Sequence, residues 1–176
     1  MPDEWFPLEE LSGRIGALVW VEERLFEVVG EWSSTEPVHA AAVVFAATSG
    51  HHGWHSQLLR DCLPTAVQLQ EPPLVRPPTA GWESSIATMR ALVGEDATSA
   101  RLASLTKVVD PWLAREIGAL LDLSRPTSDA AIARWLRFVE IDHQDDGLAT
   151  AQVLDELQAN IVSFRGRALA AELDLR

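Results

Sequence analysis

Apolar residues in this chain recur at steps of three and four positions along most of its length, and strict alternation of apolar and polar residues is absent. This spacing is typical of α-helices, because three or four residues complete about one helical turn and return to the same face. Tyrosine is missing, and β-branched residues form only short clusters. The sequence therefore predicts an all-α protein without strands.

Helix-breaking residues divide the chain into four long helical stretches. The expected stretches cover residues 11–32, 37–63, 82–123 and 129–160, with interruptions in the third at 94–96 and 110–111 and a shorter helical tail after the fourth. The breaks follow from proline and glycine, which end helices or begin them in the first turn.

The segment 64–81 separates the second stretch from the third and is rich in proline. Its prolines are Pro64, Pro72, Pro73, Pro77 and Pro78. Extended polyproline geometry advances ~3.1 Å per residue, so about 17 residues can span roughly 50 Å. A ~25-residue helix is shorter, at 1.5 Å per residue. We therefore expect this segment to cross the full length of a helical bundle between its second and third helices.

The composition favours one domain, residues 1–176, with the core of the bundle at about 8–160. Apolar residues make up 47% of the chain, and its formal net charge is −12. Duplex nucleic acid is not expected as a partner, because Lys107 is the only lysine and basic residues form no cluster. Association into a homodimer is compatible with these features.

A cytoplasmic location without a membrane anchor is expected. Cys62 is the only cysteine, so no internal disulfide points to an oxidising compartment. The first residues lack the basic and apolar regions of a secretory signal. No stretch approaches the ~18 uninterrupted apolar residues of a membrane span.

Glu22 lies in the middle of an otherwise apolar stripe of the first helix. That stripe is formed by Leu11, Ile15, Leu18, Glu22, Leu25 and Val29. A carboxylate buried in such a stripe is costly unless it is paired or bound to a metal ion. Glu23 falls on the neighbouring stripe and is the alternative ligand. A slight rotation of the helix, with Glu22 at the edge of the core, is the structural alternative.

Three histidines gather near the end of the second helix. His52 and His55 are three positions apart, so both can point at one centre, whereas His51 and His55 form a competing pair four apart. Imidazole nitrogens are common ligands of first-row transition metals. The cluster therefore indicates a metal site, with Thr48 as a candidate partner of the ligands.

The fourth helix carries the step Glu140-Ile141-Asp142-His143 within its apolar stripe. A glutamate three residues before a histidine is the spacing that di-iron carboxylate bundles use. Asp142 and Gln144 are candidate partners of such ligands. The alternative is a solvated acidic helix face, because Asp145 and Asp146 are also nearby.

The third helix offers the least certain ligand. Asp110 and Glu140 lie at similar distances from the loop that joins their helices, so the two side chains are expected at similar heights. Glu116 lies about 9 Å off that level and remains the alternative. Because Pro111 follows Asp110, an equally good interpretation is that Asp110 caps the start of a helix.

These positions resemble the ferritin-like superfamily of di-metal carboxylate proteins, and more closely its small non-haem di-iron oxygenases, the tRNA-hydroxylase-like branch included, than iron-storage ferritins. The resemblance implies a four-helix bundle with one long crossover. It also implies one or two iron or manganese ions held by Glu22, His52, His55, Asp110, Glu140 and His143. The chain departs from the family pattern at two points. His52 occupies a position where the family has glutamate, and the third helix lacks a clear glutamate.

The resemblance implies a metal-dependent oxidase or hydroxylase that acts on a small organic substrate and takes electrons from a separate reductase. The alternative hypothesis is a non-catalytic helical bundle that binds a protein partner and keeps a vestigial or structural metal site.

Overall fold

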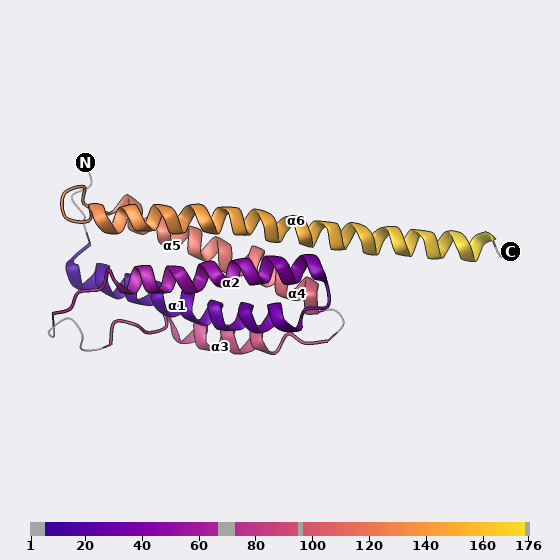
Figure 1. Ribbon diagram of the computed structural model, residues 1–176, viewed down its shortest axis with the longest axis horizontal. Helices are drawn as coiled ribbons and strands as arrows, with labels where there is room; N and C mark the ends of the chain where they lie inside the picture. The colour runs from indigo at the N-terminus through magenta and orange to yellow at the C-terminus, as the bar shows by residue number, and fades with distance from the viewer. Residues whose placement is uncertain (1–5, 67–72, 95–96, 175–176) are drawn as a thin grey trace.

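The computed structural model describes residues 6–66, 73–94 and 97–174, with side chains up to residue 159. These residues form helices and no strands, which confirms the all-α prediction (Figure 1). The elements are α1 (Leu8–Thr35), α2 (His39–Arg60), α3 (Ala80–Arg90), α4 (Ala97–Ser104), the π-helical turn η2 (Leu105–Val109), α5 (Asp110–Asp122) and α6 (Ala130–Asp174). None of the described helices is both long enough and apolar enough to span a membrane.

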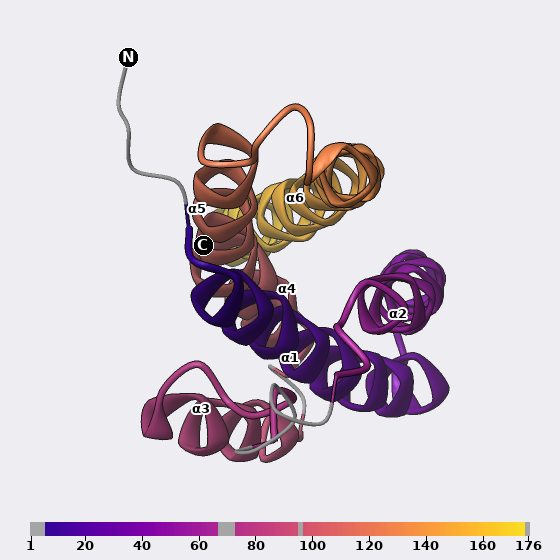
Figure 2. The same ribbon diagram turned by 90° about the vertical axis from the view of Figure 1, so that its left-hand side faces the viewer.

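Helices α1 and α2 form an antiparallel hairpin, and α4, η2 and α5 follow one another without a break as a single rod. Helix α6 packs against both α2 and this rod, while α3 lies outside them against α1 (Figure 2). A buried ion pair, Arg101 Nη1 to Glu36 Oε2 at 2.9 Å, ties α4 to the turn between α1 and α2. The packing is that of a helical bundle.

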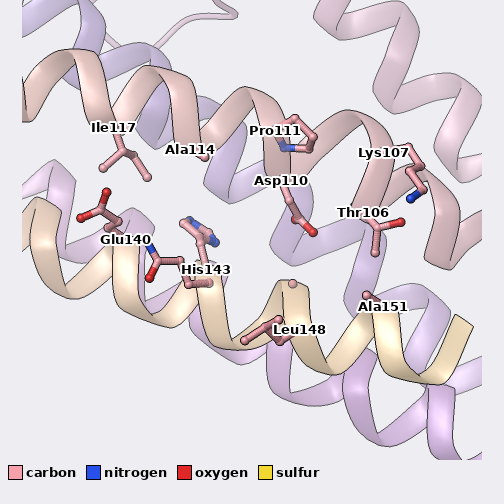
Figure 3. Close-up of a pocket in the computed structure, with 12 residues that line it drawn as sticks. Thr106, Lys107, Asp110, Pro111, Ala114, Ile117, Glu140, His143, Leu148 and Ala151 are labelled. Atoms are coloured by element: carbon pink, nitrogen blue, oxygen red, sulfur yellow. The ribbon is translucent and has the colours of Figure 1, made fainter. Parts of the chain in front are cut away.

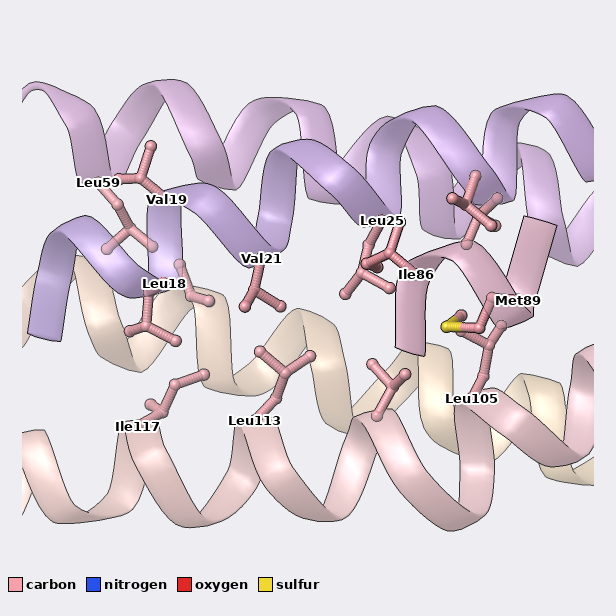
Figure 4. Close-up of a cluster of buried hydrophobic side chains, with 14 of the residues drawn as sticks. Leu18, Val19, Val21, Leu25, Leu59, Ile86, Met89, Leu105, Leu113 and Ile117 are labelled. Carbon is pink, nitrogen blue, oxygen red and sulfur yellow. The ribbon is translucent and has the colours of Figure 1, made fainter. Parts of the chain in front are cut away.

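The predicted apolar stripe of α1 is buried along its length, Glu22 included. Leu18 and Val21 point from α1 toward Ile117 and Leu113 of α5 (Figure 4). Complete burial of each such side chain stabilises the fold by about 1.5–3 kcal/mol. The helices are therefore held together by the apolar faces that the helical spacing predicts.

The third helical stretch is not one helix with interruptions, as the sequence predicted. Helix α3 ends at Arg90, and the chain then folds back, so that α3 and the α4–η2–α5 rod run in opposite directions (Figure 1). Gly94 has a φ of 102°, a conformation that other residues rarely adopt. Ile86 and Met89 bury the inner face of α3 in the core. Residues 95–96 of the predicted break lie outside the described residues.

The predicted interruption at Asp110–Pro111 is wrong, and so is the capping role of Asp110. Val109 and Asp110 both have helical dihedral angles, and the Asp110 amide donates to the Leu105 carbonyl across a π-helical turn. Pro111 lacks an N–H group, and its ring crowds the carbonyl four residues earlier. We attribute the wider η2 turn to this crowding, because such turns absorb local distortion without ending a helix.

Helix α6 continues to Asp174 as one helix, whereas the sequence predicted an end near Asn160 and a separate tail. Pro126 is the last proline of the chain, so no strong breaker follows it. The bounds of α1 and α2 and the start of α6 differ from the predicted ones by at most three residues.

Only part of the predicted crossover can be followed, because residues 67–72 lie outside the described residues. Leu74 crosses α1 at Gly16, where a Cβ atom would overlap the Leu74 carbonyl oxygen. Helix α3 then continues along α1 toward the end where α4 begins (Figure 1). The length of the bundle is therefore crossed partly by a helix and not by extended chain alone.

Candidate metal centre

Four side chains from three helices meet inside the bundle. They are Glu22 of α1, His52 and His55 of α2, and His143 of α6. All four are buried, and one donor atom from each lies within 4.8 Å of the donor atoms of the other three. The structure thus brings together four of the six residues that the sequence predicted as ligands.

The hairpin of α1 and α2 places three of these residues. His52 and His55 are three apart and therefore share the face of α2 that turns toward Glu22. The Ser49 hydroxyl donates to the Phe26 carbonyl at 2.9 Å, which fixes α2 against α1. At Gly53 a Cβ atom would lie 3.0 Å from the Phe26 ring, so the two helices are close here.

Each oxygen of the Glu22 carboxylate accepts one imidazole N–H group. His52 Nδ1 donates to Oε2 at 2.6 Å, and His143 Nε2 donates to Oε1 at 2.8 Å. Burial acts to raise the pKa of Glu22, but His143 and His52 together hold it well below its ordinary value. Glu22 is therefore an anion in the centre of the bundle.

His55 is the least satisfied member of the group. Its Nε2 lies 3.0 Å from Asp142 Oδ2, whereas its Nδ1 is buried without a hydrogen-bond partner among the described residues. Nδ1 lies 3.7 Å from Glu22 Oε2. With the ring proton on Nε2, a lone pair on Nδ1 faces the carboxylate charge, which is unfavourable. A cation between the two atoms would remove this conflict.

The pKa shifts of His55 and His52 are consistent with a cation bound between these side chains. Burial acts to lower the pKa of His55, yet the carboxylates of Glu22 and Asp142 raise it overall. The site thus attracts positive charge to His55. Burial lowers the pKa of His52 despite the opposing effect of Glu22, which favours the neutral imidazole that metal ions bind.

The donor set fits a single divalent transition-metal ion. A tetrahedral ion with bonds of ~2.1 Å separates its ligand atoms by about 3.4 Å. The contacts of 2.6 and 2.8 Å would lengthen, and the wider separations, 3.7 Å between His55 and Glu22 and up to 4.8 Å within the group, would shorten. Three imidazoles and one carboxylate suit iron, manganese and zinc alike. Asp142 already holds His55 from outside, as partners of metal-bound histidines do.

Asp110 and Glu140 do not join this group. They line a pocket of about 540 Å³ between the η2–α5 rod and α6, and His143 lines it as well (Figure 3). Asp110 packs over Gly147, where a Cβ atom would lie 3.2 Å from Asp110 Oδ2. Their role as metal ligands stays a prediction.

The three alternative ligands lie outside the group, and each has another partner. His51 pairs with Asp146 at 2.9 Å, Glu23 with Arg60, and Glu116 with Arg14 at 3.0 Å.

Of the three residues that the sequence predicted as partners of the metal ligands, only Asp142 bonds to a member of the four-residue group. Thr48 is buried, and its hydroxyl has no hydrogen-bond partner in the part of the chain that the structure describes, whereas Gln144 lines the pocket. Asp146 is a buried carboxylate that the sequence did not single out. It lies three residues after His143 and four before Thr150, so the helical spacing that selected those two positions also indicates it.

No family model matches the chain, and neither does any curated protein or solved structure. The functional argument therefore rests on the residues and their geometry.

Proposed function

We propose that this protein is a metal-dependent oxidoreductase that holds one iron or manganese ion between Glu22, His52, His55 and His143. The observation that carries the proposal is the buried Nδ1 atom of His55, which has no partner among the described residues and faces a carboxylate. A bound iron or manganese ion would supply the redox chemistry for oxidising an organic substrate. We also propose that the helices are arranged as in a ferritin-like four-helix bundle and that a separate reductase supplies the electrons.

The protein's own contribution is to hold the ligands in place. Glu22 supplies one negative charge, which neutralises half the charge of a divalent ion. The other three ligands are imidazoles, so the occupied site keeps a net positive charge. Asp142 orients His55 through its Nε2 atom. This arrangement limits both the movement and the protonation of the ligands.

A substrate would approach through the pocket beside His143. Ile117, Ala114 and Leu148 give this pocket apolar walls. His143 is 8% exposed, and it is the member of the four-residue group that also lines the pocket. A molecule in the pocket therefore lies next to the metal centre without entering the buried hairpin of α1 and α2.

A second candidate function is a non-catalytic bundle that binds a protein partner. One observation favours it. Phe26 and Trp54 are 49% and 46% exposed, and both line a hollow on the outer face of α1 and α2. Large exposed aromatic side chains are typical of protein interfaces.

Metal analysis of untagged protein tests the main proposal. After anaerobic addition of Fe(II) or Mn(II), we expect close to one ion per chain, lost in His55→Ala. His39→Ala serves as the matched control, because His39 is exposed at the start of α2. Failure to bind either ion contradicts the proposal. Stable metal binding without any dioxygen-dependent absorbance change contradicts the redox function and favours a structural metal.

A further inference from the structure

Helix α6 continues well past the rest of the bundle. Its last buried side chains among those described are Val153 and Leu154, and Leu157 still packs against the core. Because the helix ends only at Asp174, residues 158–174 extend it by roughly 25 Å at 1.5 Å per residue. Figure 1 shows none of the other described helices alongside this part of α6, which we call the extension.

The apolar face that holds α6 in the bundle continues along the extension. Inside the bundle this face includes Leu136, His143 and Thr150, which are all buried and lie seven positions apart. The same spacing leads on to 157, 164 and 171, and a second series lies three positions before each of these. The positions of both series hold Leu154, Leu157, Ile161, Phe164, Ala168 and Ala171. Two apolar positions in every seven are typical of a coiled coil.

The sequence of the extension does not favour a helix that stands alone in water. Helices in proteins gain most of their stability by packing an apolar face, and less from the intrinsic preference of their residues. Gly166 weakens that preference further. A second helix on the apolar face of the extension would supply the packing that a lone helix lacks.

The bundle restricts which helix can cover this face. Helix α2 and the α4–η2–α5 rod pack against α6 in the bundle, so a partner helix on the same face of the extension must end where they begin. The extension of a second copy meets this limit when the two α6 helices run antiparallel, because each then ends at the other's bundle. In a parallel pair, α6 of the second copy would overlap α2 and the rod of the first.

We propose that two copies of this protein pair through their α6 extensions in antiparallel orientation. A two-fold axis presents the same face of both copies to each other, so one apolar face is enough for the contact. With the axis between residues 162 and 163, position 157 of one copy lies level with 168 of the other, and 161 with 164. None of these positions belongs to the metal centre, so the pairing does not depend on the proposed function.

The charges of the extension fit this orientation. Arg165 and Arg167 of one copy lie level with residues 158–160 of the other. The acidic residues Asp155 and Glu156 of that second copy follow within about one helical turn. A parallel pair in register would instead place each arginine level with the same arginine of the other copy. Opposite charges beside the seam of a coiled coil favour one orientation over the other.

The oligomeric state of the full chain tests the inference. Sedimentation equilibrium at micromolar concentrations is expected to give a mass close to twice the 19.3 kDa of one chain. Phe164→Glu, within the apolar repeat, should weaken the dimer by about 100-fold or more, because it would place a charge in the contact. Ser163→Glu adds the same charge one position away, outside the repeat, and should leave the dimer intact. A monomeric unaltered chain overturns the inference, as does a dimer that survives Phe164→Glu.

Disulfide formation tests the orientation without relying on that variant. Leu157→Cys and Ala168→Cys are made in separate chains, each with Cys62→Ser to remove the native thiol. In an antiparallel pair of one chain of each kind, the two substituted positions lie level. In a pair of identical chains they are offset by roughly 16 Å along the axis, too far for a disulfide.

Oxidation of the mixture should therefore join the two variants, and oxidation of either variant alone should not. Disulfides between identical chains would mean a parallel pair and overturn the inference. A mixture that forms no disulfide would overturn it as well.

Discussion

The Nδ1 atom of His55 lies 3.7 Å from the Oε2 atom of Glu22, and it has no hydrogen-bond partner within the described residues. His55 is fully buried, so water does not replace the missing partner. A buried polar atom without a partner costs about 1–3 kcal/mol. Functional sites often carry such a cost, because the missing partner is the ligand.

Replacing His55 by leucine should separate stability from metal binding. The change removes the hydrogen bond to Asp142 but also removes the unpartnered nitrogen. We expect the unfolding free energy of the metal-free variant to stay within about 1 kcal/mol of the unaltered protein. Metal at 100 times its dissociation constant should stabilise the unaltered protein by about 2.7 kcal/mol and the variant not at all. Urea unfolding with and without Mn(II) measures both quantities.

His39→Leu is the control for this experiment, since it alters an exposed histidine of the same helix. It should keep the full response to Mn(II). A His55→Leu protein that retains the response would show that His55 is not a ligand.

Asp110 should make stability depend on pH. Burial raises the pKa of Asp110 from 3.8 to about 6, with His143 lowering it and Asp146 raising it. Because this folded-state pKa lies above the ordinary value, the stability that Asp110 contributes is complete below pH 3.8 and is lost as pH rises through about 6. Asp110→Asn removes this loss. The difference in unfolding free energy between variant and unaltered protein should grow by about 2 kcal/mol from acidic to neutral pH.

Urea unfolding at a series of pH values measures that difference, and Asp145→Asn controls for the change in net charge. Equal differences at acidic and neutral pH would mean that the Asp110 carboxylate is not held away from water in the folded protein.

A side chain at Gly16 should destabilise the protein, because residue 74 of the chain crosses α1 at this position. A Cβ atom at this position would overlap the carbonyl oxygen of Leu74, so Gly16→Ala must displace backbone. We expect a loss of about 1–3 kcal/mol in unfolding free energy. Gly13→Ala in the same helix meets nothing within 4 Å and should stabilise by up to ~1 kcal/mol. Equal effects of the two changes on the urea midpoint would contradict the described path of Leu74.

The meeting of Glu22, His52, His55 and His143 could be predicted from the sequence, because each lies on an apolar stripe of a regular helix. The separate direction of Glu140 could not be predicted from spacing, because Glu140 and His143 are three residues apart, as His52 and His55 are. His143 reaches the buried group, whereas Glu140 faces the pocket.

The position of Asp110 could not be predicted in the same way. Counting residues assumes a regular helix, but the π turn at η2 contains an extra residue and changes the direction of every side chain relative to the preceding helix. Gly94, in the turn after α3, has a positive φ, and composition alone does not reveal that the chain folds back there.

The most direct test of the metal centre is an anomalous diffraction map from crystals of the Mn(II)-loaded protein. We predict one peak, about 2.0–2.3 Å from an oxygen of Glu22 and from a nitrogen of each of His52, His55 and His143. A loaded protein with no peak between these four side chains, or with its peak at Asp110 and Glu140, would contradict the account.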